Sequence, residues 1–251
     1  MRRFFVLLLL ALVAGGSQWA RAQKIIEKTA SLAPGQRLYL DLRQASSIRI
    51  RPGAGRAVTV KASVSINQNK LNDALLLAAQ QTAEELKFAS DFDEKMLRTA
   101  QPGDCPNGGA HYGNMYISGD KKDKKDPGHY RDGRDGYQVC AVIDYEITVP
   151  TDANLRVNTY SGNIDIAGLA GPIEAKSLSG FVDVTWPPGR GAELALKTIT
   201  GEVYTDQDIA FTNARGKNPI VGYQLRGTLS GSGPLVKLES ISNDVYFRKR
   251  K

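Results

Sequence analysis

Residues 155–190 read LRVNTYSGN, IDIAGLAGP, IEAKSLSGF and VDVTWPPGR when they are written in nines. Every unit has an apolar residue at its first and third positions and glycine at its eighth. Two apolar side chains separated by one residue face the same side of a β-strand. Glycine suits a corner because it reaches positive φ and lets neighbouring backbones approach closely. The stretch therefore predicts short strands joined by regular corners at Gly162, Gly171, Gly180 and Gly189.

A longer unit of strand, corner and strand recurs along the second half of the chain. Its copies are LRVNTYSGNIDI, IEAKSLSGFVDV, LALKTITGEVYT and VKLESISNDVYF, which begin at positions 155, 173, 194 and 236. The third copy has Gly201 at its corner and the fourth has Asn243, the residue type that best tolerates positive φ after glycine. Two strands per copy are typical of a solenoid in which each rung stacks on the preceding one. A Greek-key sandwich is the alternative, but it gives no reason for regular corners.

The sequence thus predicts a mainly β protein with a β-solenoid, or parallel β-helix-like, architecture and a single domain over residues 23–251. In the first half, Val58 to Ile66 alternate as one strand with a buried face. Apolar residues then recur at helical spacing, which predicts a helix over 70–84 that covers the β core. Residues 101–136 form a long inserted loop whose six basic and six acidic side chains leave it without net charge.

Cys105 and Cys140 are the two cysteines of the chain. An even pair in an exported protein normally closes, so we expect a disulfide that clips the long loop. In the chain-entropy model, closing a loop of about 36 residues contributes roughly 3 to 4 kcal/mol. A redox-active pair is the alternative, but it favours close spacing such as Cys-x-x-Cys.

Residues 1–22 have the order of a secretory signal peptide: two arginines, an apolar run and Ala20-Arg21-Ala22. The run is about eleven residues long, whereas a bilayer crossing needs about twenty. We expect an exported chain, periplasmic, surface-located or extracellular, without a transmembrane segment after cleavage; an uncleaved signal anchor is the alternative. Cleavage lowers the net charge from +7 to +4 by removing three arginines. The remaining basic residues form no stripe interleaved with aromatics, which argues against nucleic-acid binding.

No metal or cofactor site is expected. The corners carry hydroxyl groups where calcium-binding β-rolls carry carboxylates. The two histidines, His111 and His129, both lie in the long loop, without neighbours at the spacing of zinc ligands.

The segment from Asp144 to Lys249 resembles the bacterial β-strand-repeat family described as putative adhesins. The resemblance is carried by the Val-Pro entry at residues 149–155, the repeated Ser/Thr-Gly corners, and a closing strand that ends in Arg-Lys. The corner at Asn243 departs from the pattern by lacking glycine, and the loop 101–136 lies outside it. The resemblance implies an exported β-solenoid with no established catalysis.

Three functions fit these features. The first is a non-catalytic envelope or surface protein that binds a protein or a glycan through its sheet faces and its clipped loop. The second is a carbohydrate-active enzyme, a polysaccharide lyase or hydrolase, because Asp165 and Asp183 occupy equivalent positions in successive copies and predict a carboxylate row. The third is a purely structural or sensor module of the periplasm. The absence of a convincing catalytic set in the sequence favours the first.

Overall fold

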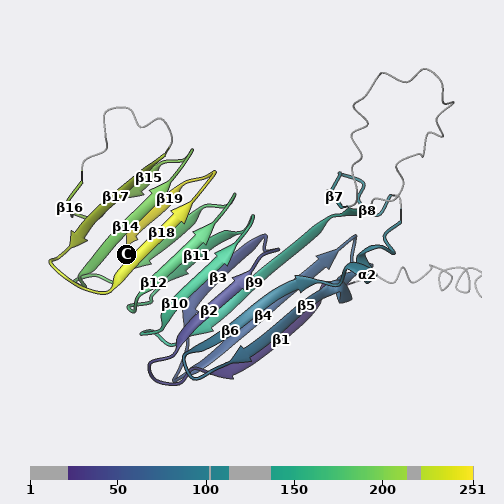
Figure 1. Ribbon diagram of the computed structural model, residues 1–251, viewed down its shortest axis with the longest axis horizontal. Coiled ribbons are helices and arrows are strands. Elements are labelled where there is room, and N and C mark those ends of the chain that lie inside the picture. The colour runs from purple at the N-terminus through teal and green to yellow at the C-terminus, as the bar shows by residue number, and fades with distance from the viewer. Residues whose placement is uncertain (1–21, 102, 113–136, 214–221, 251) are drawn as a thin grey trace, which may run out of the picture.

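The computed structural model describes residues 22–101, 103–112, 137–213 and 222–250 (Figure 1). The predicted signal peptide lies outside these ranges except for Ala22, and so do residues 113–136 of the long loop. Among the described residues, no helix reaches the length and hydropathy that a membrane crossing requires.

Most of the described chain forms two sheets, which confirms the mainly β class. Sheet A has eight strands in the order β1 (Lys24–Ser31), β4 (Ala57–Ile66), β9 (Ala141–Val149), β3 (Ser47–Pro52), β11 (Asn163–Ala167), β13 (Val182–Trp186), β19 (Val245–Lys249) and β15 (Val203–Thr205). Sheet B has nine in the order β16 (Ile209–Phe211), β17 (Tyr223–Leu229), β14 (Ala192–Thr198), β18 (Leu235–Ser240), β12 (Ile173–Ser177), β10 (Asn154–Thr159), β2 (Arg37–Leu42), β6 (Glu85–Phe92) and β5 (Leu75–Gln81). A short pair, β7 (Ala110–Tyr112) and β8 (Tyr137–Val139), stands apart from both sheets.

The core fills the space between sheets A and B. The alternation predicted from sequence places its apolar side chains there: Leu155, Val157, Ile164, Ile166, Ile173, Ala175, Val182, Val184, Leu194 and Leu196 are all buried. So are the inward residues of β4 from Val58 to Ile66. Burying an aliphatic side chain of this size contributes about 1.5–3 kcal/mol, so this inner layer supplies the main driving force for folding.

The strand–corner–strand copies form two-strand units with one strand in each sheet. The unit β10–β11 stacks in parallel on β12–β13, with Leu155 opposite Ile173 and Ile164 opposite Val182. An earlier unit, β2–β3, stacks on the other side of β10–β11 in the same parallel arrangement. Equivalent strands of successive copies therefore lie side by side (Figure 1), with equivalent residues in register.

The order of the units differs from the predicted one. The copy that begins at 236 forms β18–β19, and it lies between β12–β13 and β14–β15, the copy that begins at 194. The chain reaches this position because β17 returns antiparallel along the outer side of β14. At the other end of the molecule, β1, β4, β5, β6 and β9 include antiparallel pairs. Both sheets are thus mixed, and a continuous parallel solenoid is not confirmed.

The helix predicted over residues 70–84 is wrong. A single 3-10 turn, η1 (Asn72–Ala74), precedes strand β5, which pairs antiparallel with β6. Leu75 and Leu77 face the core while Leu76 is half exposed, so the side chains follow the strand period of two. A short apolar run of this kind fits both the helical period of 3.6 and the strand period of two. The strand forms here because β6 has a free edge with which it can pair. The only α-helix among the described residues is one turn, α2 (Glu94–Leu97), capped by the Asp93 carboxylate.

Candidate binding site

The predicted disulfide is present. Cys105 and Cys140 are bonded, with their Cα atoms 5.6 Å apart. Cys140 lies between β8 and β9, so the bond attaches the segment before β7 to the start of a central strand of sheet A. His111 lies in β7, whereas His129 is outside the described residues. Within the described ranges, no three His, Cys, Asp or Glu side chains gather as metal ligands would.

A left-handed turn packs against this disulfide. Asn67, Gln68 and Asn69 have φ values of 47°, 55° and 66°. Such a conformation costs about 1–2 kcal/mol per residue. The buried Asn67 offsets part of that cost: its Oδ1 accepts the Cys140 N–H at 3.0 Å, and its Nδ2 donates to the Gln138 carbonyl at 3.0 Å. The turn and the disulfide therefore form one rigid wall.

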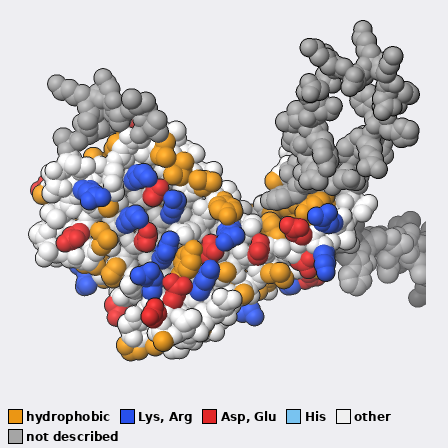
Figure 2. Space-filling model, viewed as in Figure 1, with side chains coloured by type: hydrophobic (Ala, Val, Ile, Leu, Met, Phe, Trp, Pro, Cys, Tyr) orange, Lys and Arg blue, Asp and Glu red, His pale blue; other side chains and the backbone are white. Residues whose placement is uncertain are grey.

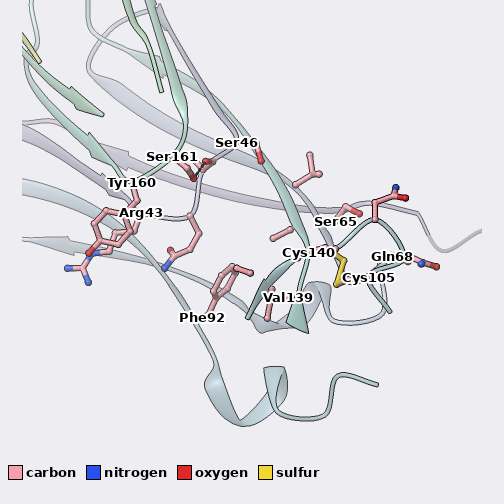
Figure 3. Close-up of a pocket in the computed structure, with 18 of the residues that line it drawn as sticks. Arg43, Ser46, Ser65, Gln68, Phe92, Cys105, Val139, Cys140, Tyr160 and Ser161 are labelled. Atoms are coloured by element: carbon pink, nitrogen blue, oxygen red, sulfur yellow. Dashed lines mark hydrogen bonds between the residues drawn. A yellow bond between two sulfur atoms is a disulfide. The ribbon is translucent and has the colours of Figure 1, made fainter. Parts of the chain in front are cut away.

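An open hollow of about 720 Å³, which we call the disulfide hollow, lies beside this wall (Figure 3). Gln68 and the disulfide stand on one side of it, and Arg43 and Tyr160 on the other. Phe92 reaches into the space between them, among small and polar side chains that include Ser65. Gln44 also lines the hollow, and its Oε1 is buried without a hydrogen-bond donor among the described residues. The hollow thus combines apolar surface with small polar side chains.

Arg43 and Tyr160 also border a second hollow, of about 270 Å³, on the outer face of sheet B. The Arg43 guanidinium lies 6.0 Å from the centre of the Tyr160 ring. Tyr160 is 54% exposed and lines both hollows, so it lies where the two hollows meet. A ligand that lies across Tyr160 contacts both.

A regular apolar column continues from Tyr160 along the corners of the stacked units. It consists of Tyr160, Leu178, Ile241 and Ile199, and each is followed by an exposed Ser or Thr. Backbone bonds hold the column in register: the N–H of Ser179 donates to the Tyr160 carbonyl at 2.8 Å, and that of Ser242 to the Leu178 carbonyl at 3.1 Å. We call this surface, with its flanking hydroxyls, the corner ridge. Its repeat follows the strand spacing of about 4.8 Å.

Buried hydroxyls fix the ridge from inside. Thr159, Ser177, Ser240 and Thr198 lie opposite one another in adjacent strands of sheet B. Ser177 shows the pattern: its Oγ donates to the Gly162 carbonyl of the neighbouring unit and accepts the Gly180 N–H, both at 2.9 Å. Each hydroxyl thus closes its own corner and links it to the next.

The predicted corners need glycine for two different reasons, close approach of a neighbouring backbone and a positive φ. A Cβ on Gly180 would lie 2.1 Å from the Gly162 carbonyl oxygen, and one on Gly201 would lie 2.2 Å from the Asn243 oxygen. Gly171 is similarly close to the backbone of Asp152 and Ala153. Gly189 instead has open space around it but a φ of +70°. At Asn243 the side chain folds onto its own turn, where Oδ1 accepts the Asp244 N–H at 2.8 Å.

The predicted carboxylate row lies on the outer face of sheet A. Asp165 and Asp183 are direct neighbours in adjacent parallel strands. Each is held by an arginine: Arg51 Nη2 lies 2.6 Å from Asp165 Oδ2, and Arg248 Nε donates to Asp183 Oδ1 at 3.0 Å. The Arg248 Nη2 also contacts Asp183 Oδ2. The two carboxylates are thus occupied by ion pairs.

The outer face of sheet B carries a lattice of charges, and each of its central carboxylates lies between two cations. Glu174 lies 2.8 Å from Lys237 Nζ, and this hydrogen bond lowers the pKa of Glu174. Glu239 accepts from Lys176 at 3.3 Å and Lys197 at 3.2 Å; burial alone would raise its pKa, but the two lysines outweigh burial and lower it. Figure 2 shows basic and acidic side chains interspersed over the region of β10, β12, β18 and β14. Four cations thus surround two carboxylates, and this part of the face keeps an excess of positive charge.

No model of a protein family and no curated protein matches the chain. Among solved structures, a putative cell adhesion protein of Clostridium sporogenes aligns with a TM-score of 0.47 and 10% identity, over 90% of this chain and 100% of that one. A putative adhesin of Bacteroides fragilis aligns with a TM-score of 0.28 and 10% identity, over 90% of this chain and 97% of that one. Both similarities are distant, and membership of the adhesin-like family stays a prediction.

Proposed function

We propose that this chain is a non-catalytic binding protein of the cell envelope or cell surface, which binds a protein or a glycan through its exposed surfaces, and that the disulfide hollow and the corner ridge form its site for a partner protein. The observation that carries the proposal is the position of Tyr160. Its exposed ring borders two hollows and begins an apolar column with exposed hydroxyls at a regular spacing. A surface of this kind fits an extended partner with its own regular repeat.

The rigidity of the site supports this function. The disulfide, the buried Asn67 and the hydroxyls behind the ridge fix its backbone before any partner arrives. A preorganised surface loses little conformational freedom on binding, so more of the contact energy appears as affinity. We further propose that the in-register units from β2–β3 to β14–β15 act as a short solenoid-like scaffold for the ridge. The disulfide supports export, because such bonds persist in oxidising compartments.

The alternative of a carbohydrate-active enzyme gains no support from the carboxylate row, because both aspartates are engaged by arginines. A purely structural or sensor role is the outcome expected if the ridge binds nothing.

Capture experiments with a matched control test the proposal. Immobilised protein is exposed to envelope extract, in parallel with Tyr160→Ala and Ile25→Ala. Ile25 is 51% exposed, similar to Tyr160 at 54%, but it lies on β1, an edge strand of sheet A. We expect Tyr160→Ala to lower specific capture at least about tenfold, as removal of an aromatic anchor does, and Ile25→Ala to retain it. Equal capture by all three proteins, or no specific capture by any, would contradict the proposal.

A further inference from the structure

The outer face of sheet A carries a row of side chains that the corner ridge does not use. Asp165, Asp183, Tyr246 and Tyr204 are direct neighbours across β11, β13, β19 and β15. Adjacent strands are about 4.8 Å apart, so these side chains form one continuous row at that spacing. Two carboxylates with their arginines occupy one half of the row, and two tyrosines occupy the other.

The tyrosines form an ordered aromatic cluster. The rings of Tyr204 and Tyr246 are stacked, with centres 5.2 Å apart and planes 15° apart. Phe181 meets Tyr246 edge-on at 6.0 Å, and the Arg248 guanidinium lies 5.6 Å from the centre of the same ring. Tyr246 is thus enclosed by neighbours. Tyr204 is 49% exposed and belongs to β15, beyond which sheet A has no further strand among the described residues. One face of its ring is therefore available.

Oriented hydrogen-bonding groups adjoin the cluster. Arg248 holds both oxygens of the buried Asp183, and Arg51 holds Asp165. On the other side of Tyr246, its hydroxyl donates to Asp244 Oδ2 at 3.0 Å. A guanidinium has five N–H donors and a carboxylate has about four acceptor positions, so the exposed arginines keep donors for a ligand and the partly exposed Asp165 keeps acceptor positions. Asp165, Asp183 and Asp244 are matched by Arg51, Arg248 and Arg49, which lies opposite Asp165 in β3. This balance favours a neutral ligand over a polyanion or a polycation.

A flat aromatic ring beside planar donor–acceptor pairs matches the two sides of a sugar. A pyranose has an apolar C–H face that stacks on a ring and a rim of hydroxyls that both donate and accept. We propose that this row binds a neutral polysaccharide, with one sugar unit on the free face of Tyr204 and the following units directed along the row toward the Asp183–Arg248 pair. The proposal rests on the proposed binding function but assigns the glycan to sheet A, away from the corner ridge.

Affinity electrophoresis tests this assignment. The wild-type protein, Tyr204→Ala, Tyr204→Leu and Tyr204→Phe are run in native gels that contain hydroxyethylcellulose, galactomannan or dextran, together with Tyr160→Ala for the competing site and Ile25→Ala as the control. We expect the wild type to be retarded by at least one polymer. Tyr204→Ala and Tyr204→Leu should weaken that association at least about tenfold, whereas Tyr204→Phe, which keeps the ring, and Ile25→Ala, which removes a similarly exposed side chain at the opposite edge of sheet A, should retain it. Far-UV circular dichroism melts identify any variant whose fold has changed, and Tyr204→Leu keeps apolar volume if Tyr204→Ala destabilises the edge strand.

The outcomes separate this inference from the proposed function. If no polymer retards the wild type, the glycan inference is overturned, while a loss of capture in Tyr160→Ala still supports the binding function. If Tyr160→Ala abolishes retardation and Tyr204→Ala does not, the glycan binds at the corner ridge and the sheet A assignment is overturned. If the wild type shows neither retardation nor capture, both proposals fail.

Discussion

Replacing Gly180 by alanine tests how tightly the repeating units are stacked. The added Cβ would lie 2.1 Å from the Gly162 carbonyl oxygen and 2.4 Å from its carbon, both of them backbone atoms of the neighbouring unit. Ordinary contact needs more than an additional ångström, so β12–β13 must move away from β10–β11. The same carbonyl accepts the Ser177 hydroxyl at 2.9 Å, and the Gly180 carbonyl accepts that of Ser240 at 2.9 Å. The displacement therefore weakens buried hydrogen bonds on both sides of the corner.

The expected cost combines two effects. Overpacking of a close-packed interior costs about 1–3 kcal/mol, and each weakened buried hydrogen bond adds about 1 kcal/mol. We expect Gly180→Ala to lower the free energy of unfolding by about 3 kcal/mol, which for a domain of this size lowers Tm by about 6–12 °C. Thermal melts and urea unfolding followed by far-UV circular dichroism measure both quantities.

Gly189→Ala is the matched control. No atom lies within 4 Å of its added Cβ, and only its φ of +70° opposes the substitution. The left-handed conformation should cost about 1–2 kcal/mol, so the control should lose less stability than Gly180→Ala. If the two variants lose the same stability, or if Gly189→Ala loses more, close stacking is not what requires glycine at the corners.

Three further results are expected. Removing the disulfide in a Cys105→Ala, Cys140→Ala double variant should lower the free energy of unfolding by about 3–4 kcal/mol, given the sequence separation of 35; a loss below about 1 kcal/mol in urea titrations would refute the chain-entropy account. Burial raises the pKa of Tyr145 to about 12 from 10.0, with Ser90 offsetting only part of the effect, so the unfolded chain ionises first and stability should fall between pH 10 and 12. Tyr145→Phe should flatten that fall in pH-dependent melts, and an unchanged slope would contradict it. The lowered pKa of Glu174 contributes stability that is lost as pH falls below its usual value of 4.5; in Lys237→Met, NMR titration should show that pKa moving upward, and an unmoved pKa would exclude the lysine as its cause.

The middle of the fold could be predicted from local sequence because each copy carries its own strand alternation and corner. The buried pairs from Leu155 to Val184 and the Cys105–Cys140 bond follow from such local or pairwise signals. The segment 70–84 could not, because its leucines fit both a helix and a strand, and only the neighbouring β6 selects the strand. The stacking order of the two-strand units could not be predicted from the sequence either. The copies have similar inward-facing residues, so each could stack on any other. The local sequence therefore does not determine which copies are adjacent.

The candidate site depends still more on tertiary contacts. Tyr160 belongs to a corner that the sequence predicts. The hollows that this residue borders depend on Arg43, Phe92 and the disulfide wall, which come from distant parts of the chain. The left-handed turn at Asn67 had one signal, a cluster of asparagines, the non-glycine type that most readily adopts positive φ. The sequence correctly predicts that Asp165 and Asp183 are neighbours in adjacent strands. Their engagement by Arg51 and Arg248 could not be predicted, since both arginines come from other units of the chain.

The position of β18–β19 has a consequence for how this protein is made and how it can change. The last strands of the chain lie inside the stack, with β14–β15 on one side and β12–β13 on the other. Until the C-terminal residues have been synthesised, the strand pair β14–β15 has no adjacent unit on which to stack. Truncation at the C-terminus would therefore remove an internal layer and separate the outer unit from the rest. Tandem duplication of this copy would meet the same obstacle, because β18–β19 already has a unit on each side and offers no free edge to the new copy.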